Sequence, residues 1–133
     1  MTDRDATHLD ALAATIRRLR SIVEPLDEAA IGQPAYPREW TIAQVMSHLG
    51  SAAVIMQRRF EAALAGAAVL DEFAPSAWDE WNAKSPRAQV DDALAADAAL
   101  AAALETLSDE EREGFSSRPV PYVSASRARW PPA

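Results

Sequence analysis

The sequence contains no cysteine and only two histidines among its 133 residues. The absence of cysteine excludes disulfides, thiolate metal ligands and a cysteine nucleophile. No uncharged apolar run reaches the roughly 18 residues that a membrane-spanning helix needs, and the N-terminal segment MTDRDATHLD is polar. The sequence therefore predicts no transmembrane segment and no signal peptide, and we expect a cytoplasmic protein.

Positive charge is also scarce, since 13 Lys and Arg residues face 20 Asp and Glu residues and the net charge is -7. Binding to nucleic acid needs a basic surface, so no nucleic-acid partner is expected. Every acidic residue lies at or before Glu113, whereas three arginines and four prolines follow it. This change predicts a helical bundle domain over residues 1–114 and an irregular tail over residues 115–133.

The segment from Trp40 to Gly66 carries the clearest helix signals in the chain. Thr41 and Gln44 fit a capping box, and Gly66 stands where a left-handed cap ends a helix. Apolar residues at helical spacing predict one buried stripe, made of Ile42, Val45, Met46, Leu49, Ala53, Met56, Phe60 and Leu64. His48 lies at the shoulder of this stripe, where it either bonds a carbonyl or carboxylate at the core edge or binds a ligand.

Two further long helices are predicted, over residues 7–23 and from Pro86 to about residue 107, so the expected fold class is all-α. Ser85 is the N-cap of the later helix, with Pro86 at its first position. A second capping box at Ser108 predicts a short helix over residues 109–113, which Gly114 would end. The tail shows no apolar period, and we therefore expect no fourth long helix.

The two segments that connect the three predicted long helices contain aromatic residues, and each of these residues has two alternative roles. Tyr36, in the loop over residues 25–39, either plugs the end of the bundle or hydrogen-bonds a ligand. Trp78 and Trp81 would share a face if a helix forms between Pro75 and Asn82. They are then either core residues or an apolar wall around a substrate.

Three parts of the chain resemble the N-terminal domain of mycothiol-dependent maleylpyruvate isomerases, over roughly the first 115 residues. They are Trp40-Thr41-Ile42 continuing to His48-Leu49, the preceding Pro34-Ala35-Tyr36-Pro37, and the later Trp81-Asn82-Ala83-Lys84-Ser85-Pro86, which is similar to actinobacterial members. The resemblance implies a DinB-like up-and-down four-helix bundle that binds zinc and uses mycothiol as cosubstrate. His48 would be the first zinc ligand, and Tyr36 and Trp81 would lie near the thiol.

The family's other two zinc ligands, a glutamate and a histidine on a later helix, have no counterpart here. No histidine follows His48, and no glutamate follows Glu113. One hypothesis is a zinc- and mycothiol-dependent isomerase or thiol transferase built around His48, acting on a small molecule. The alternative is a non-catalytic helical domain that forms a homodimer through the groove left by a missing fourth helix.

Overall fold

The computed structural model describes residues 3–36 and 38–116, and within them every regular element is an α-helix apart from one isolated antiparallel bridge between Pro34 and Thr41. The predicted all-α fold is confirmed. The helices are α1 (Asp3–Val23), α2 (Glu28–Ile31), α3 (Ile42–Leu64), α4 (Phe73–Asn82), α5 (Pro86–Glu105) and α6 (Asp109–Ser116).

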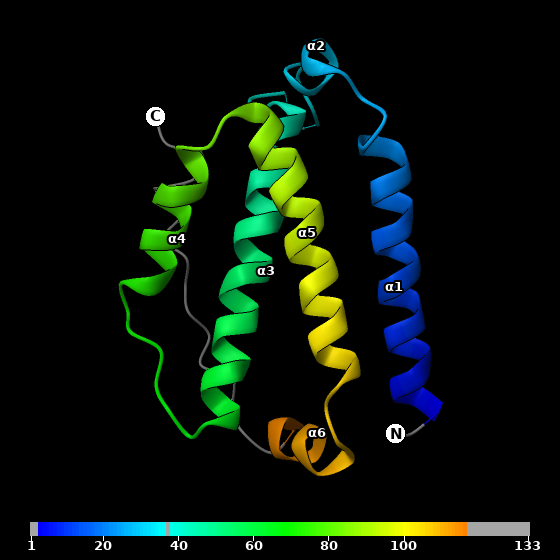
Figure 1. Cartoon of the computed structure of the whole chain (residues 1–133), viewed down its shortest axis with the longest axis vertical. Helices are drawn as coiled ribbons and strands as arrows, with labels where there is room; N and C mark the ends of the chain where they lie inside the picture. Colours follow the sequence, from blue (N-terminus) through cyan, green and yellow to red (C-terminus); the bar gives the residue numbers. More distant parts are fainter. Residues whose placement is uncertain (1–2, 37, 117–133) are drawn as a thin grey trace.

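The helices form an up-and-down bundle in which α4, α3, α5 and α1 lie side by side (Figure 1). After α3 the chain runs back along α4 before α5 begins. Helices α3 and α5 therefore run in the same direction, and they pack closely against each other. The short helices α2 and α6 lie at opposite ends of the long helices (Figure 1). No helix in the described ranges is long and apolar enough to span a membrane.

The helix ends confirm most of the predicted caps. The Thr41 N–H donates to Gln44 Oε1 at 2.8 Å, and the Gln44 N–H donates to Thr41 Oγ1 at 3.1 Å, which completes the capping box of α3. Gly66 has a φ of +68°, and the Ala67 N–H donates to the Ala62 carbonyl at 2.8 Å, as in a Schellman motif. Ser85 caps α5 as expected.

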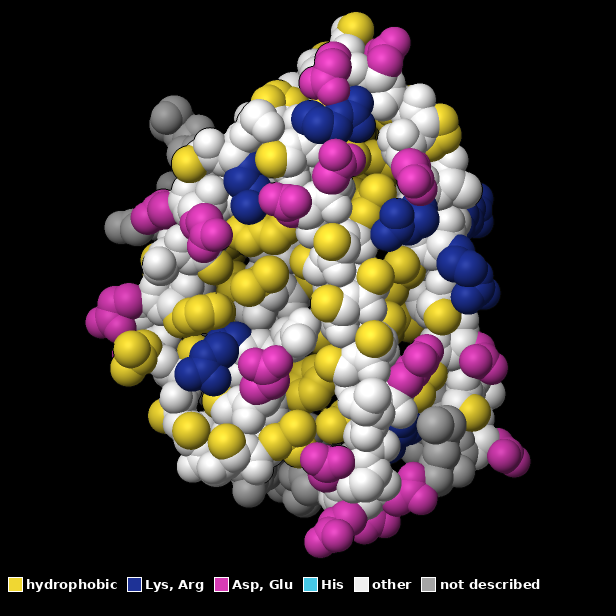
Figure 2. Space-filling view, in the orientation of Figure 1, with side chains coloured by type: hydrophobic (Ala, Val, Ile, Leu, Met, Phe, Trp, Pro, Cys, Tyr) yellow, Lys and Arg dark blue, Asp and Glu magenta, His cyan; other side chains and the backbone are white. Residues whose placement is uncertain are grey.

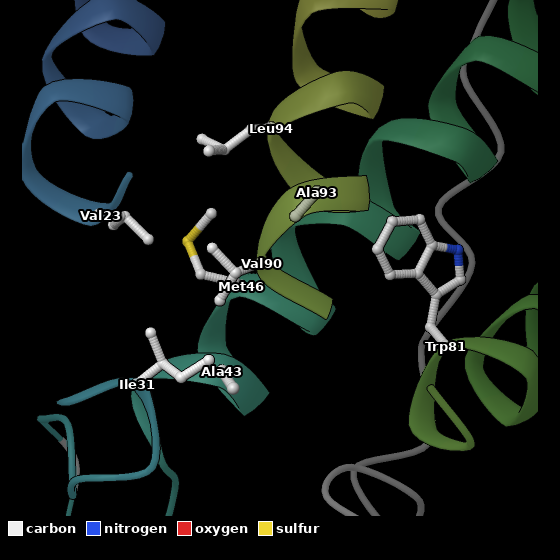
Figure 3. Packing of buried hydrophobic residues seen from close by; sticks show 8 residues of the cluster. All are labelled: Val23, Ile31, Ala43, Met46, Trp81, Val90, Ala93 and Leu94. Carbon is white, nitrogen blue, oxygen red and sulfur yellow. The ribbon is translucent and has the colours of Figure 1, made fainter. Parts of the chain in front are cut away.

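The main core lies where α1, α2, α3 and α5 meet, and Trp81 of α4 also belongs to it. Figure 3 shows the Met46 side chain of α3 between Val23 of α1 and Val90 of α5, with Ile31 of α2 closing the end. Ile31 and Val90 are fully buried. A second, smaller cluster joins α3 to α4 through Ile55, Ala74 and Ala77. Both clusters hold α3 in place, although from different sides.

The predicted stripe of α3 is only partly buried, because the neighbouring helices α4 and α5 pack against a different face of this helix. Met46, Ala53 and Phe60 are buried as expected, whereas Leu49 and Met56 are 37% and 50% exposed. Small residues instead let α4 and α5 approach this helix closely. The buried face of α3 therefore includes Ser47, Gly50 and Ser51, which apolar periodicity does not identify.

The C-terminal part of the chain also differs from the prediction. Ser108 and Glu111 form the expected capping box at the start of α6. The helix does not end at Gly114, however, and continues to Ser116. The remaining residues of the predicted tail, 117–133, lie outside the described residues.

An ion pair fastens α2 to the start of α5. Arg87 Nε donates to Glu28 Oε1 at 2.6 Å, and its Nη2 donates to the Leu26 carbonyl at 2.9 Å. The hydrogen bond that Arg87 donates to the Glu28 carboxylate raises the pKa of the guanidinium. Basic and acidic side chains accordingly lie next to each other near the α2 end in Figure 2, and acidic ones surround the α6 end.

Candidate functional site

The candidate site is centred on His48, which lies on the second turn of α3 with its side chain exposed. Helical side chains lean toward the N-terminus of their helix, so this imidazole leans toward the residues that precede α3. There it meets Trp40, with the ring centroids 5.6 Å apart and the ring planes at 63°. This edge-to-face arrangement is one that aromatic rings prefer.

The imidazole is covered on one side and open to solvent on the other. This partial burial lowers the pKa of His48 below its usual value of 6.5, because the charged form loses hydration. His48 is therefore mainly neutral at pH 7. A neutral imidazole carries a lone pair in the plane of its ring and can bind a metal ion or accept a hydrogen bond.

The loop before α3 is held together by its backbone. The Ala35 N–H donates to the Trp40 carbonyl at 2.7 Å, and the Ile42 N–H donates to the Gln33 carbonyl at 3.0 Å. Tyr36 lies in this loop and is 97% exposed, so its predicted role as a plug of the bundle end is wrong. Its predicted role in binding a ligand remains a prediction.

Trp81 is 5% exposed and lies in the core, as one of its two predicted roles requires. Its carbonyl accepts a hydrogen bond from Gln89 Nε2 at 3.2 Å, and the ammonium of Lys84 lies 4.8 Å from its ring centroid. The indole packs against α3 at Gly50, two residues after His48. Positions two apart on a helix face roughly opposite directions, so the structure brings Trp40 rather than Trp81 to the imidazole.

The described residues form no metal-binding cluster around His48. In residues 3–36 and 38–116, no group of three or more His, Cys, Asp or Glu side chains is arranged to hold a metal ion. A catalytic zinc needs about three protein ligands and one open position. The described residues taken alone therefore do not fit a catalytic zinc, and His48 is the single imidazole that they contribute at this position.

Two polar features of the bundle were not predicted from the sequence. Asp97 lies on α5 one heptad after the core residue Val90, and burial raises the pKa of its carboxyl above the usual 3.8. Ser47 is fully buried, and its hydroxyl has no hydrogen-bond partner among the described residues. The position of Asp97, one heptad after an apolar core residue, could have predicted its burial from the sequence. The burial of Ser47 could not have been predicted in this way, because it depends on how the helices pack.

Trp40 is the third feature that sequence reasoning did not assign to the site. The sequence predicted Trp40 to form a hydrophobic staple with Val45 at the start of α3. Trp40 precedes α3, which begins at Ile42, so helical periodicity does not place it beside His48. The contact depends on the path of the loop before α3.

Together, the fold and the site define an all-α bundle with an exposed imidazole near the start of its second long helix. Residues 12–131 match the family described as the mycothiol maleylpyruvate isomerase N-terminal domain. This chain belongs to that family, as the Trp40 to His48 motif indicated. No curated protein and no solved structure matches the chain.

Proposed function

We propose that this chain is a binding domain rather than a self-sufficient isomerase. In this role His48 supplies one imidazole donor to a divalent metal such as zinc, and another polypeptide supplies the remaining donors. A small-molecule thiol such as mycothiol would act as cosubstrate only in that assembly. The proposal follows the family membership, and it assigns to this chain one donor, the His48 imidazole.

The environment of His48 is the observation that carries the proposal. Its side chain is exposed on α3, and partial burial lowers the pKa of the imidazole, which favours the neutral form. Metal ions bind the neutral form, so the imidazole needs to lose little or no proton at pH 7. The described ranges contain no cluster of three metal-binding side chains, and the proposal therefore draws the further donors from another polypeptide.

Zinc binding to the untagged protein tests this role. Zinc should bind the native chain weakly, and His48→Ala should abolish that binding. His8→Ala is the matched control, because His8 is exposed at the start of α1 and should contribute nothing. Binding is followed by calorimetry and by elemental analysis after dialysis. If zinc binds His48→Ala as well as the native chain, His48 is not a donor and the proposal fails.

A second candidate function is self-association without metal chemistry. Leu49 and Met56 are exposed, and Ala52 lies between them on the same side of α3. Exposed apolar patches often mark protein interfaces. In this case the chain would form a homodimer through α3.

Sedimentation analysis separates the two candidates. A dimer that Leu49→Ser and Met56→Ser convert to monomer, while zinc binding is absent, would favour the second function. Ile22→Ser is the matched control, because Ile22 is an exposed apolar residue on α1 (57% exposed). A monomer at all concentrations would exclude self-association.

A further inference from the structure

One side of α3 is both exposed and apolar. From Ile42 to Gln57 this helix contains no Lys, Arg, Asp or Glu residue. Leu49 and Met56 are nevertheless 37% and 50% exposed, and Ala52 between them is exposed as well. The water-exposed side of a helix in a soluble protein is usually charged or polar. These three residues, which we call the α3 face, therefore have the character of a contact surface.

The α3 face is small at its centre and larger at both ends. With 3.6 residues per turn, Leu49, Ala52 and Met56 point within about 60° of one another. Ala52 carries only a methyl group, so a second helix can approach there with its axis about 8–10 Å away. Leu49 and Met56 flank Ala52 along the helix. A helix that crosses at Ala52 would therefore touch both of them.

The charge of the chain favours a second copy as the partner. A net charge of -7 makes two copies repel each other over most approaches. The α3 face has no acidic residue, so two copies can meet there without opposing carboxylates. Symmetric dimers use the same surface on both subunits, and the α3 face is complementary to itself when one copy is reversed. Leu49 of each copy then lies opposite Met56 of the other.

Arg59 favours the antiparallel orientation of the two helices. It is half-buried and follows Met56 by about one turn, at the edge of the α3 face. In a parallel pair the two Arg59 side chains would lie side by side and repel each other. In an antiparallel pair that crosses beside Ala52, a rise of about 1.5 Å per residue separates them by about 20 Å along the axes. This distance exceeds the Debye length of about 8 Å at physiological salt, so their repulsion is largely screened.

From these observations we infer that two copies of this chain pair through antiparallel α3 helices. Ala52 of each copy lies at the crossing, and Leu49 of one copy packs against Met56 of the other. The inference rests on the second candidate function, self-association, and assigns its partner, its surface and its orientation. It requires neither a metal ion nor the His48 imidazole.

Engineered cysteines test the surface, because the native chain has no cysteine that could compete. Ala52→Cys places one thiol of each copy at the crossing, within the short range that a disulfide needs. Under mild oxidation this variant should form linked dimers at least about tenfold faster than a control, since a bound partner presents its thiol at millimolar rather than micromolar concentration. Ile22→Cys is the matched control, because Ile22 is exposed on a different helix, α1.

Mixed variants test the orientation. Leu49→Cys and Met56→Cys should cross-link to each other in a mixture faster than either variant cross-links to itself. Mass spectrometry of the linked dimers distinguishes the mixed product from the two symmetric ones, and circular dichroism before oxidation checks that each variant is folded. Faster linking of Leu49→Cys to itself would indicate parallel helices and overturn the inference, although self-association would stand.

Sedimentation of the native chain separates failure of this inference from failure of self-association. A dimer whose Ala52→Cys variant cross-links no faster than Ile22→Cys pairs through another surface, which overturns this inference alone. A monomer at all concentrations overturns both. Occupation of the α3 face by a different protein or by another segment of the chain would give that same monomeric result. The role of His48 is tested independently, by zinc binding.

Discussion

Gly50 of α3 packs against the indole of Trp81 on α4, and a Cβ at this position would collide with the six-membered part of that ring. The same Cβ would be 2.9 Å from the Cα of Ala93 on α5. One position therefore sets how closely three helices approach. The absence of a side chain at Gly50 lets Trp81 become a core residue and keeps α3 in the register that exposes His48.

Gly50→Ala should lower the free energy of unfolding. Overpacking a core costs about 1–3 kcal/mol, and the better helix propensity of alanine returns about 1 kcal/mol at most. Urea unfolding followed by circular dichroism measures the difference. Gly32→Ala is the control, because its added Cβ would meet no atom closer than 3.7 Å. Equal unfolding midpoints for the two variants would show that the contact with Trp81 is relaxed at little cost.

Ser47→Ala should leave the protein as stable as the native chain or make it more stable, by up to about 1 kcal/mol. The Ser47 hydroxyl is buried without a described partner, so its removal relieves a desolvation cost. Ser51 is equally buried, but its hydroxyl donates to the His48 carbonyl at 3.0 Å. Ser51→Ala should therefore be the less stable variant of the two, and thermal unfolding that ranks them in the reverse order would contradict this account.

Thr41→Ala should destabilise the protein by about 1 kcal/mol, because it removes the side-chain acceptor at the start of α3. Thr15→Ala is the matched control. The Thr15 hydroxyl bonds the Ala11 carbonyl at 2.8 Å inside the exposed part of α1, where alanine is the better helix former. Denaturant unfolding should separate the two variants, and equal stability would mean that the cap contributes little.

Asp97→Asn should stabilise the protein at neutral pH and have a smaller effect in acid. Burial raises the pKa of Asp97 in the folded state above 3.8, so the folded chain binds more protons than the unfolded chain between these two pKa values. The stability of the native protein therefore falls as pH rises through this window. The substituted side chain carries an amide that does not titrate, so the variant should lose this dependence.

Melting temperatures of the native chain and of Asp97→Asn, measured from pH 3 to pH 8, test this expectation. The difference between them should grow as pH rises through the carboxyl range and then level off. A difference that stays constant across this range would show that Asp97 is hydrated in the folded state as well as in the unfolded state.

Local chemistry made three helix boundaries of this chain predictable, whereas the predicted start of the first helix at residue 7 was wrong, because α1 begins at Asp3. The capping box of Thr41, the cap at Ser85 and the left-handed Gly66 each depend on neighbouring residues in sequence. Such signals need no information about the rest of the fold. Gly114 was an exception, because a glycine can also remain inside a short helix such as α6.

The sequence by itself also determined the all-α class and the family, through the helical spacing of apolar residues and the motif around His48. Only the tertiary structure decided which face of α3 is buried. Ser47, Gly50 and Ser51 are small enough for α4 and α5 to approach closely, and the apolar residues Leu49 and Met56 are consequently left exposed. It also decided that Trp40, rather than Trp81, contacts His48, because that contact depends on the path of the loop before α3. The spacing of apolar residues predicts one face of a helix as buried. The face that is actually buried depends on which side-chain shapes fit together between the helices.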